Sequence, residues 1–194
     1  MGWFSHDIET VQDLFLHNLQ DIYYAERQIE KALPDMAAKA SDAELKKSFR
    51  SHLKQTRGQI RRLERIFKII KSVPQGTKCP AIDGMIEEAN DIASEVGDKM
   101  VLNAALIGAA QAVEHYEMTR YGSLIAWAKQ LGRNDCATIL QRTLDEEKAT
   151  DKKLNSIAKR KINRKAAARK RSQPDELERA ENAFLAATSG IPAV

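Results

Sequence analysis

Apolar side chains recur every three or four residues along four long stretches of the sequence. The first stretch repeats at Val11, Leu14, Phe15, Asn18, Ile22, Ala25, Ile29 and Leu33. The second repeats at Leu45, Phe49, Leu53, Thr56, Ile60, Leu63 and Phe67. This spacing matches the 3.6-residue turn of an α-helix, so each stretch predicts a helix with one buried face.

Capping and breaking residues set the limits of the helices. Ser5 is the expected cap of the first helix, and Ser41 with Glu44 forms a capping box for the second. The proline- and glycine-containing segment 73–80 ends the second helix.

Three further helices follow this segment. We expect a short one at about 82–94 and two long ones at about 98–131 and 135–161, separated by Gly132 and Asn134. The long helices form two antiparallel hairpins joined by a link of about 25 residues that holds the short helix. This predicts an all-α, ferritin-like four-helix bundle, with an up-down bundle and a long loop as the alternative.

Composition supports helices and excludes other classes. Five prolines and nine glycines are too few for many short strands, and only 6% of the residues are aromatic. Cys79 and Cys136 match no metal or redox spacing, which favours a cytoplasmic location. No signal peptide and no membrane-spanning run are expected.

The positive charge is concentrated near the C-terminus. Residues 152–171 hold ten lysines and arginines and no acids, whereas the rest of the chain has 21 basic and 27 acidic residues. We therefore expect a bundle at residues 1–162 and a basic tail at 163–194, with a short helix near 177–188. The candidate anion-binding residues are Lys159, Arg160, Lys161, Arg164, Lys165, Arg169, Lys170 and Arg171.

Two interpretations of this tail remain open. It is either a solvated, mobile segment or an arm that binds nucleic acid or another polyanion. No aromatic residues are interleaved with the charges, so contacts to nucleic acid would be made to phosphates without sequence preference.

Four motifs resemble those of the YciE/YciF-type ferritin-like stress proteins. They are Asp21 to Gln28 (DIYYAERQ), Glu87 to Asn90 (EEAN), Val113 to Glu117 (VEHYE) with Tyr121-Gly122, and Glu146 to Asp151 (EEKATD). The resemblance covers roughly residues 6–160. It implies a bacterial protein associated with stress responses, without implying a particular biochemical activity.

The same resemblance suggests a carboxylate metal site. In rubrerythrin-like proteins a Glu on helix one, Glu-x-x-His on helix two, Glu-x-x-Glu on helix three and Glu-x-x-His on helix four hold two metal ions. Compared with this pattern, the matching candidates are Glu26, Glu114, Glu117 and Glu147, with His52 or Asp151 as additional ligands. Such a site would hold iron or manganese weakly.

Three positions depart from that pattern. Lys54 and Arg57 occupy the ligand positions of helix two, and Thr150 replaces the histidine of helix four. The two cations either pair with glutamates in place of a metal or face water. The helical wheel favours water and indicates that His52, Thr56 and Gln59 are the inward polar groups.

Two functions are therefore open. One is a ferritin-like stress protein with a degenerate metal site, and the other is a metal-free helical scaffold acting through self-association and its basic tail. The alanine-rich side of the third long helix, around Gly108, predicts a homodimer.

Overall fold

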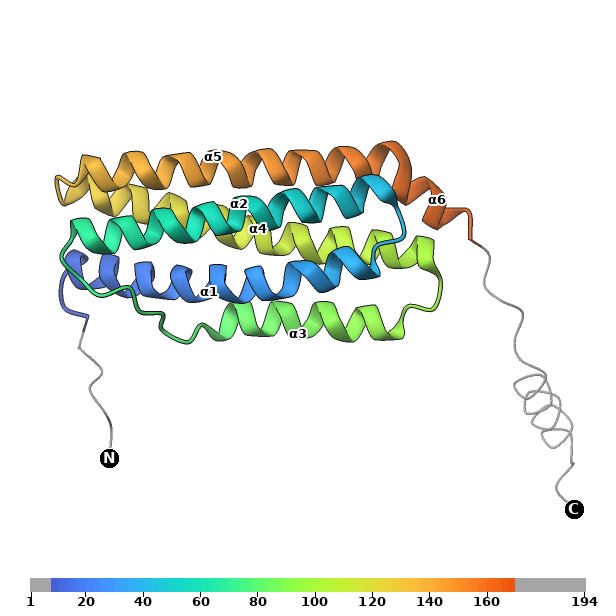
Figure 1. Ribbon diagram of the computed structural model, residues 1–194, viewed down its shortest axis with the longest axis horizontal. Helices are drawn as coiled ribbons and strands as arrows, with labels where there is room; N and C mark the ends of the chain where they lie inside the picture. Colours follow the sequence, from blue (N-terminus) through green and yellow to red (C-terminus); the bar gives the residue numbers. More distant parts are fainter. Residues whose placement is uncertain (1–7, 170–194) are drawn as a thin grey trace, which may run out of the picture.

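Figure 1 shows the computed structural model of the chain, which describes residues 8–169. The elements are α1 (Val11–Lys39), α2 (Ala43–Ile69), α3 (Pro80–Glu95), α4 (Lys99–Gln130), α5 (Asn134–Ile157), the π-helical turn η1 (Ala158–Ile162) and α6 (Asn163–Ala167). Residues 8–169 contain no strand, so the prediction of an all-α protein is confirmed. The short helix expected near 177–188 lies outside the described residues.

The four long helices form a bundle of two hairpins. Helix α1 packs against α2 and α4 against α5, while α1 also contacts α4 and α2 contacts α5. The link from α2 to α4 returns along the whole bundle, and its helix α3 lies beside α1 and α4 (Figure 1). Helices α2 and α4 consequently run in the same direction, as in bundles with one long crossover.

Two helix caps differ from those expected. Thr10 caps α1, because its hydroxyl accepts a hydrogen bond from the Asp13 amide (3.1 Å) while the Asp13 carboxylate accepts one from the Thr10 amide (3.0 Å). Helix α1 therefore begins later than a cap at Ser5 would place it, and Ser5 itself lies outside the described residues.

Asp42, and not Ser41, caps α2. Its Oδ1 accepts hydrogen bonds from the amides of Glu44 (3.0 Å) and Leu45 (3.2 Å). The Ser41 hydroxyl instead accepts a hydrogen bond from the Asn103 side chain on α4 (2.8 Å). The prediction of a Ser41 cap was wrong because contacts between helices engage its side chain.

The link before α3 is held against α1. The Thr77 amide donates to the Gln20 carbonyl (3.2 Å), and the backbone of Gly76 passes close to Tyr24. A side-chain carbon at position 76 would lie 3.0 Å from the Tyr24 Cβ, so glycine permits this close approach. The contact fixes the point from which α3 starts.

The helical path that begins with α5 runs without a break through the π-helical turn η1 and α6, beyond the end expected near residue 161. The amide of Asn163 donates to the carbonyl of Ala158, five residues earlier. Ala158 and Ile162 are buried in this turn, and α6 then packs on α4. The helical bundle thus extends to Ala167.

The core is a column of apolar side chains between the four long helices. Its fully buried members include Leu19, Ile22, Leu45, Phe49, Leu63, Phe67, Leu124, Leu140 and Leu154. None of the helices in the described range combines the length and apolar character needed to cross a bilayer. One layer near the middle of this column is polar instead.

Candidate metal centre

The polar layer is built by residues that point inward from all four long helices. Its members are Glu26 from α1, His52, Thr56 and Gln59 from α2, Glu114, Glu117 and Tyr121 from α4, and Glu147 from α5. The four glutamates have no solvent exposure, and His52 is 3% exposed. On each helix these residues continue the three- and four-residue steps of the apolar stripe, so the helical repeat carries them into the core.

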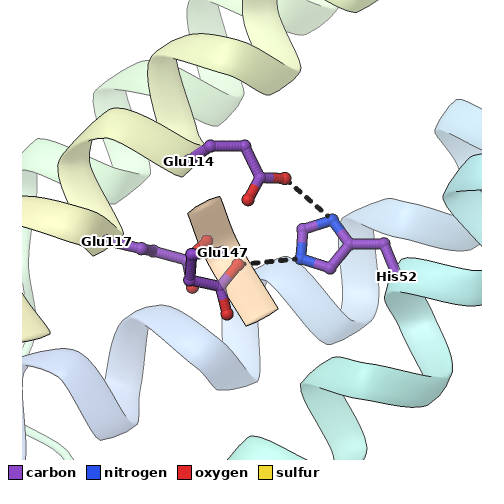
Figure 2. Close-up of side chains that lie close together, drawn as sticks. All are labelled: His52, Glu114, Glu117 and Glu147. Atoms are coloured by element: carbon purple, nitrogen blue, oxygen red, sulfur yellow. Dashed lines mark ion pairs between the residues drawn. The ribbon is translucent and has the colours of Figure 1, made fainter. Parts of the chain in front are cut away.

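Four of these side chains converge on one point (Figure 2). His52, Glu114, Glu117 and Glu147 each offer one donor atom, and these atoms all lie within 4.8 Å of one another. The Nδ1 of His52 lies 3.1 Å from Glu114 Oε1, and its Nε2 lies 3.6 Å from Glu147 Oε2. We call these four residues the His-Glu cluster.

Two neighbouring side chains bond to the carboxylates of the layer. The Gln59 amide donates a hydrogen bond to Glu147 Oε1, and the Tyr121 hydroxyl donates one to Glu26 Oε1. Beside them, the Arg62 guanidinium pairs with Glu146 and donates to the Thr143 hydroxyl (2.9 Å).

Most carboxylate oxygens in the layer lack a hydrogen-bond donor in the described part of the chain. They are Glu26 Oε2, both oxygens of Glu114, both oxygens of Glu117 and Glu147 Oε2. Buried polar atoms in folded proteins normally have partners, and leaving one unpaired costs about 1–3 kcal/mol or more. Six such oxygens lie in this one layer, and two of them, Glu114 Oε1 and Glu147 Oε2, face the nitrogens of His52; all could serve as ligands of a cation.

Burial also changes the acidity of these groups. Desolvation, followed by the charge of Glu147, raises the pKa of Glu114 to about 11. The same two causes hold the pKa of Glu26 and of Glu117 well above the ordinary value, although the Tyr121 hydrogen bond acts in the opposite direction on Glu26. The raised pKa values favour the protonated form of these carboxyls, whereas a bound cation would favour the charged form.

The chemistry of the donors suits a metal ion. Carboxylate oxygen and imidazole nitrogen bind iron, manganese and other divalent cations, and His-Glu sets from facing helices form such sites in bundles. The His-Glu cluster could therefore hold a metal ion.

The remaining predicted ligands lie outside this cluster. Glu26 is buried beside it and bonds to Tyr121. Asp151 is half-buried on α5, where it accepts a hydrogen bond from Gln111 (2.8 Å) and lies 3.3 Å from His115 Nε2.

The three departures from the rubrerythrin-like pattern have simple structural explanations. Lys54 and Arg57 are exposed, and Arg57 pairs with Glu30 (3.0 Å) on the outside of the bundle. Thr150 is buried, and its hydroxyl donates to the carbonyl of Glu146 in its own helix (3.1 Å). Helix α2 instead presents His52, which lies two residues before Lys54 and five before Arg57.

The sequence did not reveal the hydrogen-bond partners of two residues or the complete burial of two others. Tyr121 enters the sequence analysis only as part of a family motif, and the helical wheel indicates that Gln59 faces inward without indicating its partner. Glu26 and Glu117 lie at the edges of their apolar faces in the sequence pattern, where a glutamate is usually solvated. Their complete burial follows from the packing of α1 against α4, which helical periodicity does not specify.

The candidate anion-binding residues within residues 8–169 divide into two groups. Arg160 pairs with Glu44 (2.7 Å), Lys161 pairs with Asp42, the cap of α2, and Arg169 pairs with Asp98, the cap of α4 (2.7 Å). Lys159, Arg164 and Lys165 are exposed, whereas Lys170 and Arg171 lie outside the described residues.

Four long helices around a buried layer of glutamates and one histidine define a carboxylate-lined four-helix bundle. Over residues 10–167 the chain matches the family described as a domain of unknown function, DUF892, and it belongs to that family.

Relatives of known structure share both sequence and fold. Protein YciF of Escherichia coli K12 is 42% identical over 161 residues, which cover 82% of this chain and 97% of YciF. The crystal structure of this stress protein superposes with a TM-score of 0.77 over 80% of this chain and 99% of that one. YcfI from Rhodopseudomonas palustris is 53% identical and has a TM-score of 0.78, and the match covers 80% of this chain and 99% of YcfI.

A more distant relative shows only the fold. A protein from Xanthomonas campestris pv. campestris is 20% identical and has a TM-score of 0.61, covering 77% of this chain and 91% of that one.

Proposed function

We propose that this chain is a ferritin-like stress-response protein of a bacterium, whose bundle binds iron or manganese at the His-Glu cluster. The observation that carries the proposal is the set of fully buried glutamates with oxygens that lack hydrogen-bond donors. The similarity to the E. coli stress protein YciF supports the biological context.

Charge balance favours a divalent cation in this layer. Ionised Glu26, Glu114, Glu117 and Glu147 would carry four negative charges, against one positive charge at most from His52. Moving an isolated carboxylate into a protein interior costs several kcal/mol, which a bound cation offsets. A redox-active metal such as iron or manganese would supply electron-transfer chemistry, while the chain supplies the ligands and excludes water.

The number of ligands sets the expected strength of binding. No histidine follows Glu147 at the position of Thr150, and Arg57 faces outward. With one imidazole in the cluster, we expect a metal that strong chelators remove.

Metal analysis of the purified full-length protein tests this proposal. We expect iron or manganese to co-purify or to bind on addition, with affinity reduced at least tenfold by Glu114→Gln and by His52→Gln. Glu30→Gln, which alters an ion pair on the outside of α1, is the matched control and should retain wild-type affinity. Equal metal binding by the wild type and the His52 and Glu114 variants would refute the proposal.

A role for the basic segment and a homodimer remain separate proposals. Arg164 and Lys165 are exposed and have no ion-pair partner within residues 8–169, which leaves their charges available to a polyanion. Arg160, Lys161 and Arg169 would first have to leave their partners in the bundle. Sedimentation at micromolar concentration tests the homodimer.

A further inference from the structure

A cavity of about 290 Å³ lies beneath α3 and reaches the candidate metal centre. Helices α1, α3 and α4 form its walls, and its inner end is lined by His52 from α2 and Glu114 from α4. In Figure 1 this is the region where α3 runs alongside the bundle. The cavity thus connects the surface under the crossover helix with two members of the His-Glu cluster.

The polarity of the lining changes from the outside to the inside. Lys31, Asp35 and Asn90 are exposed at its outer part. The walls are mainly apolar, with Gln28 as a polar member, and include Ile29, Leu33, Met36, Met85, Ile86 and Val113. Polar atoms return at the inner end with His52 and Glu114, so a bound molecule would meet hydrocarbon along its body and polar groups at its tip.

Small side chains and the attachment of α3 explain the open space. Ala32, Ala89, Ala109 and Ala110 line the cavity from three helices. Helix α3 is fixed near its start by Ile82, its one fully buried residue. Farther along, its side chains are half-buried or exposed, so α3 covers the groove between α1 and α4 without filling it.

A buried acid lies at the inner end. Glu114 has no solvent exposure, its Oε1 lies 3.1 Å from His52 Nδ1 in an ion pair, and its Oε2 has no hydrogen-bond partner within residues 8–169. Cavities with apolar walls and a few convergent polar groups are typical of small-molecule sites. The cavity therefore combines room for a ligand with a polar inner end.

We propose that this cavity is a binding site for a neutral molecule with an apolar body and one oxygen-bearing end group directed at His52 and Glu114. The inference rests on the proposed metal centre, for which the cavity would be the substrate site. An apolar cavity of about 150 Å³ binds benzene, so this one has room for a body of about ten carbon atoms. A carboxylate end group is disfavoured in the metal-free protein because moving its charge from water into an apolar cavity without a bound cation is costly.

Calorimetric titration of the metal-free, full-length protein with benzyl alcohol and benzoate tests the cavity directly. We expect saturable binding of benzyl alcohol and at least tenfold weaker binding of benzoate. Ala89→Phe fills the cavity from α3 and should weaken benzyl alcohol binding at least tenfold. Ala81→Phe, at an exposed position of the same helix, should bind like the wild type.

A second variant distinguishes a filled cavity from misfolding of the Ala89→Phe variant. Ala32→Phe narrows the same cavity from α1 and should produce the same loss, with circular dichroism as the check on folding. No binding of benzyl alcohol by the wild type, or binding that neither substitution weakens, would overturn the inference.

Manganese-loaded protein tests the position of the ligand. Bound Mn²⁺ should broaden the proton resonances of benzyl alcohol in the wild type, and Ala89→Phe should abolish the broadening. Direct titration of Mn²⁺ separates the two proposals. If Mn²⁺ does not bind, the metal proposal fails while the metal-free titration still decides on the cavity. If Mn²⁺ and benzyl alcohol both bind without broadening, the assignment of the cavity is wrong.

Discussion

Two layers of the same bundle, two helical turns apart, differ completely in chemistry. Leu19, Leu63, Leu124 and Leu140 form an apolar layer, and seven residues away on the same four helices lie Glu26, Thr56, Glu117 and Glu147. Side chains in both layers are almost completely buried. The packing of the helices therefore determines which positions are buried. The side chains at those positions determine whether the layer is apolar and stabilises the fold, or polar and able to bind a ligand.

The largest effect should come from the apolar layer. Leu63→Ala removes a side chain that is 1% exposed and leaves a cavity between helices, so we expect a loss of about 2–5 kcal/mol in the free energy of unfolding. Urea denaturation of the metal-free protein measures it. Val73→Ala, at a residue 73% exposed in the link, should change stability by less than about 0.5 kcal/mol.

The polar layer should respond in the opposite direction. Glu117→Leu replaces a buried carboxyl without hydrogen-bond partners by an apolar side chain of similar size, so we expect the metal-free protein to gain about 1–4 kcal/mol. The same variant should lose metal affinity. A clear loss of stability in urea denaturation would show that the Glu117 carboxyl has favourable polar partners in the absence of metal.

The raised pKa values of the glutamates in the polar layer should make the stability of the protein depend on pH. The folded pKa values of Glu26, Glu114 and Glu117 are raised, so the native state holds protons that the unfolded state releases above the ordinary glutamate pKa. Metal-free stability should therefore fall as pH rises through neutrality toward the folded pKa of Glu114 near 11, by at most about 1.4 kcal/mol per pH unit for each group. Urea denaturation at pH 6 and at pH 8 measures the slope, and saturating metal should flatten it. A stability that rises with pH would contradict the assignment.

The smallest effect should come from the outside of the bundle. Lys161→Met breaks the ion pair with Asp42, the cap of α2, and should cost about 1 kcal/mol or less. Thermal melting should show this difference shrinking at high salt. Lys165→Met, which alters an exposed lysine, is the control and should leave the melting temperature unchanged. Equal shifts in the two variants would mean that the ion pair contributes nothing.

The sequence was sufficient for the fold because the helices repeat their apolar positions over many turns. Periodicity placed α2 and α4 to within a few residues, and the length of the link indicated the crossover. Caps were less predictable. Ser41 and Asp42 are both good capping residues, and only the contact of Ser41 with α4 decides between them.

The candidate site was only partly accessible to the same reasoning. Glu147 lies in the middle of its apolar face, and the wheel of α2 pointed to His52. The burial of Glu26 and Glu117 depends on how closely α1 and α4 approach each other, which is a property of the assembled bundle. Comparison with the rubrerythrin-like pattern placed Lys54 and Arg57 at ligand positions, but a helix rotation of half a turn separates them from the interior.

The π-helical turn at Ala158–Ile162 acts as a phase shift within one continuous helix. A π turn holds one more residue than the corresponding α turn, so the positions that follow are rotated by about 100° compared with an uninterrupted helix. Arg169, two residues past the end of α6, pairs with Asp98 beyond this shift. Deleting Ala158, an uncharged residue of the turn, should rotate α6 back by about 100° and direct its basic residues toward a different neighbour, without altering any charge in the segment.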